Sequence, residues 1–532
     1  MRRWRVALIG FCSNLDALGA VSDSASTLSQ ARQICKLLDN DGESVLHGLR
    51  GNYVVVAQHP ESRRLIAIRD RLGGRTLHFS KTRSAWCFAP WAAEVLSLSG
   101  HSSEVDALSI SAYFAGKAPP PGRTAFARIR ELRPGEILTI DDRGATSKWL
   151  PCLSNDDIDY RDTEKAVETF SQRLEQSVAS RLPEDGSVAC MLSGGLDSGP
   201  MAALAADKLA QQGRLFLPVS WSLKDFPEAD ETDWIRLLCR HLGLQPTFLD
   251  PAERPLDSLD EHLVSPDWPA FNPFRSLVEA CYREAARLNC RIILNGNAGD
   301  DLYPDLDLLY RGLSQHGDHR AIWRDLKLIW KHGGVRALKA HPPLRHELGR
   351  RLPWKRNRPP AWMTASAAEH WRSLPDETQS FDWHPVPPYA AQLLGSRMTF
   401  GRAHEQYFAE RCGVERRDPY HDEELAGFML NAPFSLSIRE GRTKWIMREA
   451  IKGRLPESFR LKPRTGLMSS WFRAGLDANR EKVRDLLFGE HPGWQEWVKP
   501  AIIRRALDEQ GRADTLVTRC IGYALWQRHW GA

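Results

Sequence analysis

The 532-residue chain lacks the features that would place it in a membrane, on nucleic acid or in an oxidising compartment. It has no apolar run of the roughly 18 residues that a membrane-spanning helix needs, so we expect no membrane partner. Its 72 basic and 67 acidic residues nearly balance, which argues against a nucleic-acid partner. The ten cysteines include no CxxC pair, which argues against a zinc site and favours reduced thiols in the cytoplasm.

The N-terminus also lacks a convincing secretory signal. Arg2, Arg3 and Arg5 precede a very short apolar run at 6–11, and no clear cleavage site follows that run. We therefore expect residues 6–11 to form the first strand of a folded domain.

A Walker-type phosphate loop is absent, because the chain contains no GxxxxGK[ST] sequence. A different glycine-rich stretch, SGGLDS at 193–198, follows the apolar run 187–192 and precedes apolar residues at helical spacing. The pattern predicts a buried strand, a tight turn and a helix N-terminus. Ser198 is expected to cap that helix, with Pro200 in its first turn.

Such a turn can bind an anion. Its glycines admit a close backbone approach, Ser193 and Ser198 add hydroxyl donors, and the helix start adds free N–H groups at the positive end of its dipole. Asp197 repels phosphate, so its expected role is to hold a Mg²⁺ ion that bridges the phosphates.

This stretch resembles the pyrophosphate-binding loop of the asparagine synthetase family. The resemblance implies an enzyme that adenylates a carboxylate with ATP, releases pyrophosphate and lets an amine attack the acyl-adenylate. It also implies that the nucleotide contacts this loop and the end of the next predicted strand, 215–222. The implied contact residues are Leu192, Ser193, Gly194, Gly195, Leu196, Asp197, Ser198, Ser220 and Trp221.

A second apolar run, 291–294, ends in NGNAGDDLY, which resembles the family's SGEGADELF segment. The resemblance makes Asp300 a catalytic residue and a Mg²⁺ ligand that shares one ion with Asp197, and it places Asn295 and Gly296 on the nucleotide. Ligands bind at the carboxyl ends of parallel strands, which agrees with this assignment. Asn297 replaces the family's glutamate, and because an amide cannot act as a general base, the replacement disfavours asparagine as the product.

Three segments after residue 400 also resemble the family. Residues 413–422 match GVExRxPFLD, a wall of the site held by ion pairs. Residues 441–448 match GxxKxxLR, which implies that Lys444 is catalytic and neutralises charge on the α-phosphate and the acyl oxyanion. Residues 455–467 resemble a lid whose basic residues close over the nucleotide.

The N-terminal region resembles the family's glutaminase domain through the segments RDRLGG (69–74), PGRTAF (121–126) and LRPG (132–135). That domain hydrolyses glutamine with a cysteine at position 2, where this chain has Arg2. We therefore expect the fold without glutamine hydrolysis.

These resemblances imply an α/β protein of two domains. Residues 1–152 are expected to form a degenerate Ntn-type α/β/β/α sandwich. Residues 153–532 are expected to form an ATP-pyrophosphatase domain of the adenine nucleotide α-hydrolase-like type, with a twisted parallel sheet. An insertion at about 304–398, rich in Arg, His, Trp and Pro, either grips a peptide or is a surface addition; helices are plausible at 322–330 and 367–373.

Four functions remain open. In the first, a lasso-peptide-type cyclase adenylates a peptide's Asp or Glu side chain and the peptide's own N-terminal amine closes a macrolactam; its partners would be a precursor peptide and a leader peptidase. The others are a β-lactam-synthetase-like ligase, an ammonia-using asparagine synthase, and a non-catalytic scaffold. The enzyme readings require ATP and Mg²⁺, and the peptide reading fits Asn297 and the basic, aromatic insertion best.

Overall fold

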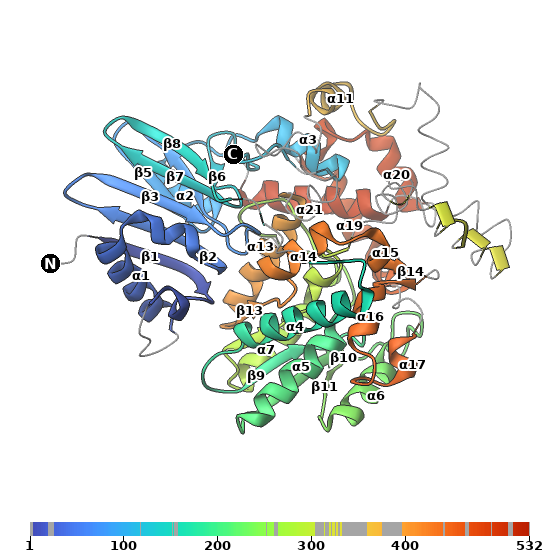
Figure 1. The fold of residues 1–532 in the computed structure, drawn as a ribbon. Helices are drawn as coiled ribbons and strands as arrows, with labels where there is room; N and C mark the ends of the chain where they lie inside the picture. Colours follow the sequence, from blue (N-terminus) through green and yellow to red (C-terminus); the bar gives the residue numbers. More distant parts are fainter. Residues whose placement is uncertain are drawn as a thin grey trace.

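Two antiparallel sheets form the N-terminal region of the computed structural model (Figure 1). The model describes residues 4–530 except 20–25, 118, 152, 154–157, 252, 260–263, 375–395, 440–441, 463–467, 491, 509–513 and most of 304–358. The larger sheet has the order β1 (Arg5–Cys12), β2 (Gly51–His59), β3 (Arg64–Arg69), β7 (Glu136–Asp141), β8 (Gly144–Trp149). The smaller sheet has the order β5 (Trp86–Ala89), β4 (His78–Lys81), β6 (Arg130–Glu131).

Alternation along β2 explains how these sheets are layered. Tyr53 and Val55 pack in the core that contains Ile34 of α1 (Thr27–Asp41), whereas Val54 packs in a second core with Leu132, on the side of the smaller sheet. Helix α2 (Ala92–Ser99) packs against β4 and β5 of the smaller sheet. The layers are therefore α/β/β/α, which confirms the predicted sandwich, and the expected strand at 6–11 is β1.

A five-stranded, all-parallel sheet lies at the centre of the C-terminal region (Figure 1). Helices α4 (Thr163–Arg181) and α5 (Ser198–Gln211) contribute to the core on one face, and α7 (Arg275–Arg287) and α13 (Ser396–Arg411) to the core on the other. Because both faces are covered, β9 is buried along its whole length, as is usual for parallel sheets. The strand order is β11 (Thr247–Leu249), β10 (Phe216–Trp221), β9 (Val188–Met191), β12 (Ile292–Leu294), β13 (Glu415–Arg417).

The C-terminal helices join the two regions. Helix α21 (Asp514–Trp530) packs with α19 (Arg480–Phe488), α20 (Pro500–Asp508) and α3 (Ala107–Ala115) of the N-terminal region (Figure 1). The indole of Trp526 is buried in the core that these helices share. No helix in the part of the chain that the structure describes has the length and hydropathy to cross a membrane.

The predicted inserted region is described only in part. The helix expected at 367–373 is α11 (Ala365–Arg372). Residues 322–324, 326–327 and 330 of the other expected helix are helical, and the rest of it lies outside the described residues.

Charged side chains within and directly after the GVExRxPFLD-like segment contact the N-terminal region. Arg75 pairs with Glu415 at 2.8 Å, Arg71 pairs with Glu423 at 2.8 Å, and the Arg417 guanidinium lies 4.3 Å from the centre of the Phe11 ring. The edge strand β13 and the residues that follow it therefore lie against the N-terminal region.

Candidate functional site

Two glycine-containing loops meet at the carboxyl edge of the parallel sheet. β9 and β12 are neighbours, so the loops that leave them, 192–197 and 295–300, start side by side. A Cβ atom on Gly299 would lie 2.5 Å from Asp197 Oδ1, and one on Gly296 would lie 3.2 Å from the Asp197 carbonyl carbon. A side chain at 299 would therefore collide with the Asp197 carboxylate, and one at 296 would be tightly packed against the Asp197 backbone.

Lys444 joins the two loops. Its Nζ donates to Asp197 Oδ1 and Oδ2 at 2.7 and 2.6 Å and lies 2.6 Å from Asp300 Oδ1. The ammonium group also lies 5.8 Å from the centre of the Tyr303 ring. The three charged side chains predicted for the site thus lie together, although their roles stay predictions.

Lys444 has an unusual backbone conformation. It is the N-cap of α16 (Trp445–Ala450), and its φ of 56° and ψ of 38° are left-handed. Non-glycine residues seldom adopt this conformation, and where they do they often serve a functional site. Here it accompanies an ammonium group turned towards the two acids.

Burial and charge oppose each other in this cluster. Burial raises the pKa of Asp197 to about 6, with a further rise from Asp300, while Lys444 lowers it. Burial by itself would lower the pKa of Lys444, but Asp197 and Asp300 outweigh it and raise that pKa above its usual value. The lysine is therefore a charged ammonium group at neutral pH.

The donor set suits Mg²⁺. Two carboxylates from adjacent loops converge on one point, and their nearest oxygens are no more than about 5 Å apart because both contact the same nitrogen. Within the described ranges, no group of three or more His, Cys, Asp or Glu residues could hold a metal by itself. One or two carboxylates supplemented by substrate phosphates and water are the usual protein contribution to a Mg²⁺ site.

The first loop differs from its prediction in one respect. Ser198 was expected to cap α5, but the N-cap residue is Asp197, whose carboxylate turns away from the helix towards Lys444. The Ser198 hydroxyl instead accepts from the Ser193 backbone N–H at 3.1 Å and so closes the turn. Pro200 lies in the first turn of α5, as predicted.

Only some of the predicted nucleotide contacts can be made by side chains. Ser193 is exposed at the loop surface, whereas the Leu192 and Leu196 side chains are buried in the core, so these leucines offer only backbone groups. Ser220 is buried and Trp221 half-buried at the carboxyl end of β10, on the same sheet edge.

The predicted residues of the second loop divide in the same way. The Asn295 side chain is buried and accepts from the Asn297 N–H at 2.8 Å, so it shapes the loop. Gly296 is buried, while Asn297 and Asp300 are exposed. The Asn297 side chain thus lies at the surface of the site, and as an amide it does not titrate.

Two residues near the site were not predicted. The buried Tyr420 donates its hydroxyl to the Asp197 carbonyl at 2.6 Å, and the buried Asp418 accepts from the Ala298 N–H at 2.7 Å. The signal was present in the sequence, because Tyr420 stands where the GVExRxPFLD pattern has phenylalanine.

Of the predicted lid, residues 455–462 are described, with the basic residues Arg460 and Lys462, whereas 463–467 lie outside the described residues. Lys462 is buried; its Nζ donates to the Gly194 carbonyl at 2.8 Å and to Glu231 at 2.6 Å. It lies 4.9 Å from the centre of the Trp234 ring. Lys462 therefore braces the first loop through the Gly194 carbonyl.

The first cysteine of the chain is unsuited to nucleophilic catalysis. Cys12 is 4% exposed at the end of β1, and burial raises the pKa of its thiol above the usual range. A buried thiol with a raised pKa is a poor nucleophile.

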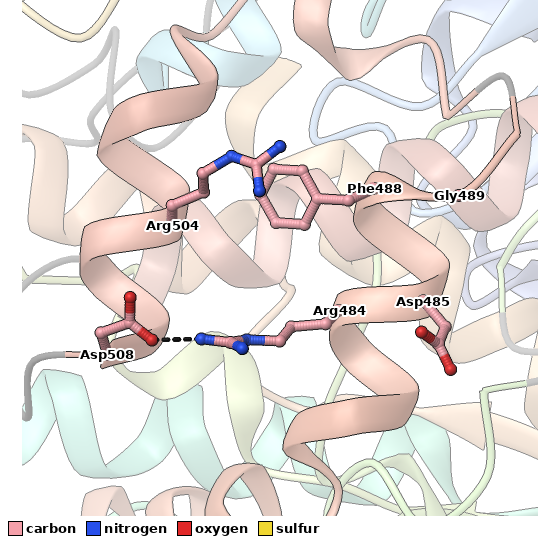
Figure 2. Close-up of a pocket in the computed structure, with 6 residues that line it drawn as sticks. All are labelled: Arg484, Asp485, Phe488, Gly489, Arg504 and Asp508. Carbon is pink, nitrogen blue, oxygen red and sulfur yellow. Dashed lines mark hydrogen bonds and ion pairs between the residues drawn. The ribbon is translucent and has the colours of Figure 1, made fainter.

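A separate cavity lies between α19 and α20, and Figure 2 shows its lining. Arg484 is paired with Asp508, and the Arg504 guanidinium lies 4.2 Å from the centre of the Phe488 ring. Its arginines are thus already in contact with neighbours, and none of the residues predicted for the nucleotide site lines it.

Comparison with known proteins identifies related chains over both regions. The family model for asparagine synthase matches residues 169–529, and the model for a glutamine amidotransferase domain matches residues 14–150. Asparagine synthetase [glutamine-hydrolyzing] 3 of Bacillus subtilis (strain 168) is 22% identical over 431 residues, which cover 78% of this chain and 66% of that protein. Amidase chyE of Penicillium rubens is 24% identical over 488 residues, covering 80% and 70%.

The chain thus spans about two thirds of the length of the curated relatives it matches. Among solved structures, glutamine phosphoribosylpyrophosphate amidotransferase from B. subtilis matches with 14% identity and a TM-score of 0.21, covering 48% of this chain and 62% of that one. A score this low carries no argument.

Proposed function

The chain belongs to the asparagine synthase family, and from that premise we propose that it is an ATP-dependent carbon–nitrogen ligase that forms AMP and pyrophosphate. The observation that carries the proposal is the contact of Lys444 with both Asp197 and Asp300 at the carboxyl edge of the parallel sheet. This edge is where ligands bind in parallel α/β sheets.

Each group has a proposed task. The turn 193–198 and the start of α5 bind the pyrophosphate part of ATP through backbone N–H groups and the Ser193 hydroxyl. Asp197 and Asp300 would hold Mg²⁺, which when bound would supply positive charge that stabilises the departing pyrophosphate. Lys444 then turns from the carboxylates towards the α-phosphate and stabilises the charge that develops on the acyl oxygen when the amine attacks.

The substrate we propose is a peptide. Its Asp or Glu side-chain carboxylate takes AMP from ATP with loss of pyrophosphate, and its own N-terminal amine then displaces AMP to close a macrolactam of the lasso-peptide type. A precursor peptide and a leader peptidase would be the partners. Two features support this choice: Asn297 gives the loop no base for ammonia chemistry, and region 304–398 is rich in arginine and tryptophan.

A second candidate is asparagine synthesis from ammonia. It is favoured by the relatives that are named asparagine synthetases, including the B. subtilis protein. A β-lactam-synthetase-like ligase is a weaker third candidate, because Asn297 also replaces the tyrosine that such enzymes have in this turn.

Exchange of labelled pyrophosphate into ATP tests the proposal. The assay compares free L-aspartate with peptides that carry an Asp or Glu several residues after a free N-terminus, each with Mg²⁺. The proposal expects peptide-stimulated exchange and a product with the mass of the peptide less one water. Exchange with aspartate and ammonia-dependent asparagine formation would instead select the second candidate. Cleavage of ATP to ADP and phosphate would reject a ligase of this family.

A further inference from the structure

Two consecutive residues after β13 face opposite neighbours. Tyr420 donates its hydroxyl to the Asp197 carbonyl at 2.6 Å, while the ring of His421 faces the N-terminal region. We infer that Tyr420 and His421 are positioning residues through which the N-terminal region holds Asp197 in its working place. The inference rests on the proposed function for the task of Asp197.

Sequence singles out both residues. In the GVExRxPFLD pattern that 413–422 resembles, the corresponding positions are phenylalanine and leucine. This chain has a polar side chain at each, and both are buried, at 1% and 4% exposure. Burying a polar group is costly unless it is hydrogen-bonded, so each substitution calls for a specific partner.

Both ring nitrogens of His421 contact residues of the N-terminal region. Its Nδ1 lies 2.8 Å from the Asn52 amide nitrogen and its Nε2 lies 2.9 Å from the Leu72 carbonyl. The amide nitrogen is a donor and the carbonyl an acceptor, so the two contacts together select a neutral ring with its proton on Nε2. Asn52 also donates towards the His421 carbonyl at 3.2 Å, which fixes its amide orientation.

The N-terminal side of this contact is rigid. Asp70, in the RDRLGG turn, accepts from the backbone N–H groups of Tyr53, Leu72 and Gly74 at 2.8–3.2 Å. A Cβ atom on Gly74 would lie 2.6 Å from Asn52 Cβ. The turn therefore presents the Leu72 carbonyl and the Asn52 amide at fixed places.

The turn after β13 contacts both nucleotide loops. Tyr420 reaches the first loop at Asp197, and Asp418 reaches the second through the Ala298 N–H while its other oxygen accepts from the Tyr420 N–H at 3.0 Å. The Arg181 guanidinium donates to the His421 carbonyl at 2.7 Å. A shift of His421 would therefore be passed to the backbone that carries both proposed metal ligands.

The test compares Tyr420→Phe, His421→Leu, Asn52→Ala and the double variant Tyr420→Phe/His421→Leu with the wild-type full chain. Hydrogen–deuterium exchange of the peptide covering 192–200 gives a readout that needs no substrate. Each single variant is expected to speed exchange there about five- to tenfold, the loss of roughly one hydrogen bond. Pyrophosphate exchange is expected to lose a similar factor in kcat with an unchanged KM for ATP.

The double variant separates positioning from simple packing. If His421 acts through Tyr420, the double variant is no worse than Tyr420→Phe alone. Arg50→Gln is the matched control, because it breaks the Arg50–Glu424 pair between the same two regions without touching the turn. It is expected to leave the peptide 192–200 as protected as in the wild type.

Additive effects in the double variant would overturn the inference, as would wild-type protection of 192–200 in folded His421→Leu. If His421→Leu does not fold, Asn52→Ala removes the partner of His421 instead, and exchange of the peptide 192–200 in that variant tests the inference. A wild-type protein that exchanges no pyrophosphate with any acid would refute the proposed function, and the deuterium measurement would still decide this inference.

Discussion

Lys444 donates hydrogen bonds to both carboxylate oxygens of Asp197, at 2.7 and 2.6 Å, across 247 residues of sequence. The same nitrogen contacts Asp300, so a single cation pairs with two acids from neighbouring loops. Asp197 and Asp300 would hold a divalent ion in the proposed function, and the Lys444 ammonium group would then be available to the phosphates. This exchange of one cation for another links the geometry to the proposed chemistry.

Replacing the lysine tests that link. Lys444→Met is expected to slow pyrophosphate exchange roughly 10²–10³-fold, because the positive charge that would stabilise the α-phosphate during adenylation is lost. Lys452→Met removes an exposed lysine from the segment that follows α16 and is expected to leave exchange unchanged. Equal activity of Lys444→Met and the wild type would remove Lys444 from the mechanism.

Replacing the exposed acid tests the metal assignment. The Asp300 side chain is 80% exposed, so Asp300→Ala is expected to change the free energy of unfolding by less than about 0.5 kcal/mol. It is nevertheless expected to abolish AMP formation, because one of the two proposed metal ligands is gone. Asp301→Ala, one residue further along the same turn, is the control that keeps activity. Unchanged AMP release by Asp300→Ala would contradict the assignment.

The close packing of the two loops predicts a steric effect. In Gly299→Ala the added Cβ would meet Asp197 Oδ1 at 2.5 Å and push the carboxylate aside, so activity is expected to fall about 10²-fold. Gly453→Ala has no atom within 4 Å of its added Cβ but has a φ of 75°, so it is expected to lose stability and keep activity. Measuring kcat and the thermal midpoint of both variants separates the loss of activity from the loss of stability. A Gly299→Ala enzyme with wild-type kcat would show that the loops can separate freely.

The contact between the regions predicts a pH effect on stability. Burial raises the pKa of Glu423 to about 7, with further rises from Asp70 and Asp422, against the lowering effect of Arg71. The unfolded value is lower, at about 4.3, so the contribution of Glu423 to stability is fully present below that value and is lost as the pH rises through about 7. The resulting change is at most about 4 kcal/mol.

Glu423→Gln is therefore expected to gain stability relative to the wild type as the pH rises from 5 to 8. Thermal midpoints of both proteins at the two pH values measure this, with an expected relative change of a few degrees. The same difference at both pH values would show that Glu423 does not carry a raised pKa.

The carboxyl edge of the parallel sheet could be predicted because the sequence patterns that mark it are local. The runs 187–192 and 291–294 are short, apolar and followed by glycine, so their strands and turns could be predicted from neighbouring residues alone. The position of Lys444 came from resemblance to a family motif, since nothing in its own neighbourhood points to a site 247 residues away.

The errors and omissions have physical causes. Ser198 was predicted as a helix cap because serine is common there, but Asp197 occupies that position and its carboxylate is held by Lys444. Tyr420 and His421 were missed because each contact crosses to another element: Tyr420 to the loop after β9, and His421 to β2 and the turn after β3. Such contacts depend on strand order, which a local pattern does not specify.

In the proposed function Asp197, Asp300 and Lys444 together bind a magnesium nucleotide. Calorimetric titration with α,β-methylene-ATP, with and without Mg²⁺, tests it without knowledge of the acid substrate. We expect the wild-type chain to bind this analogue tightly only when Mg²⁺ is present, and Asp300→Ala to lose that dependence together with most of the affinity. Equal, magnesium-dependent affinity in the wild type and Asp300→Ala would show that Asp300 does not take part in binding the magnesium nucleotide.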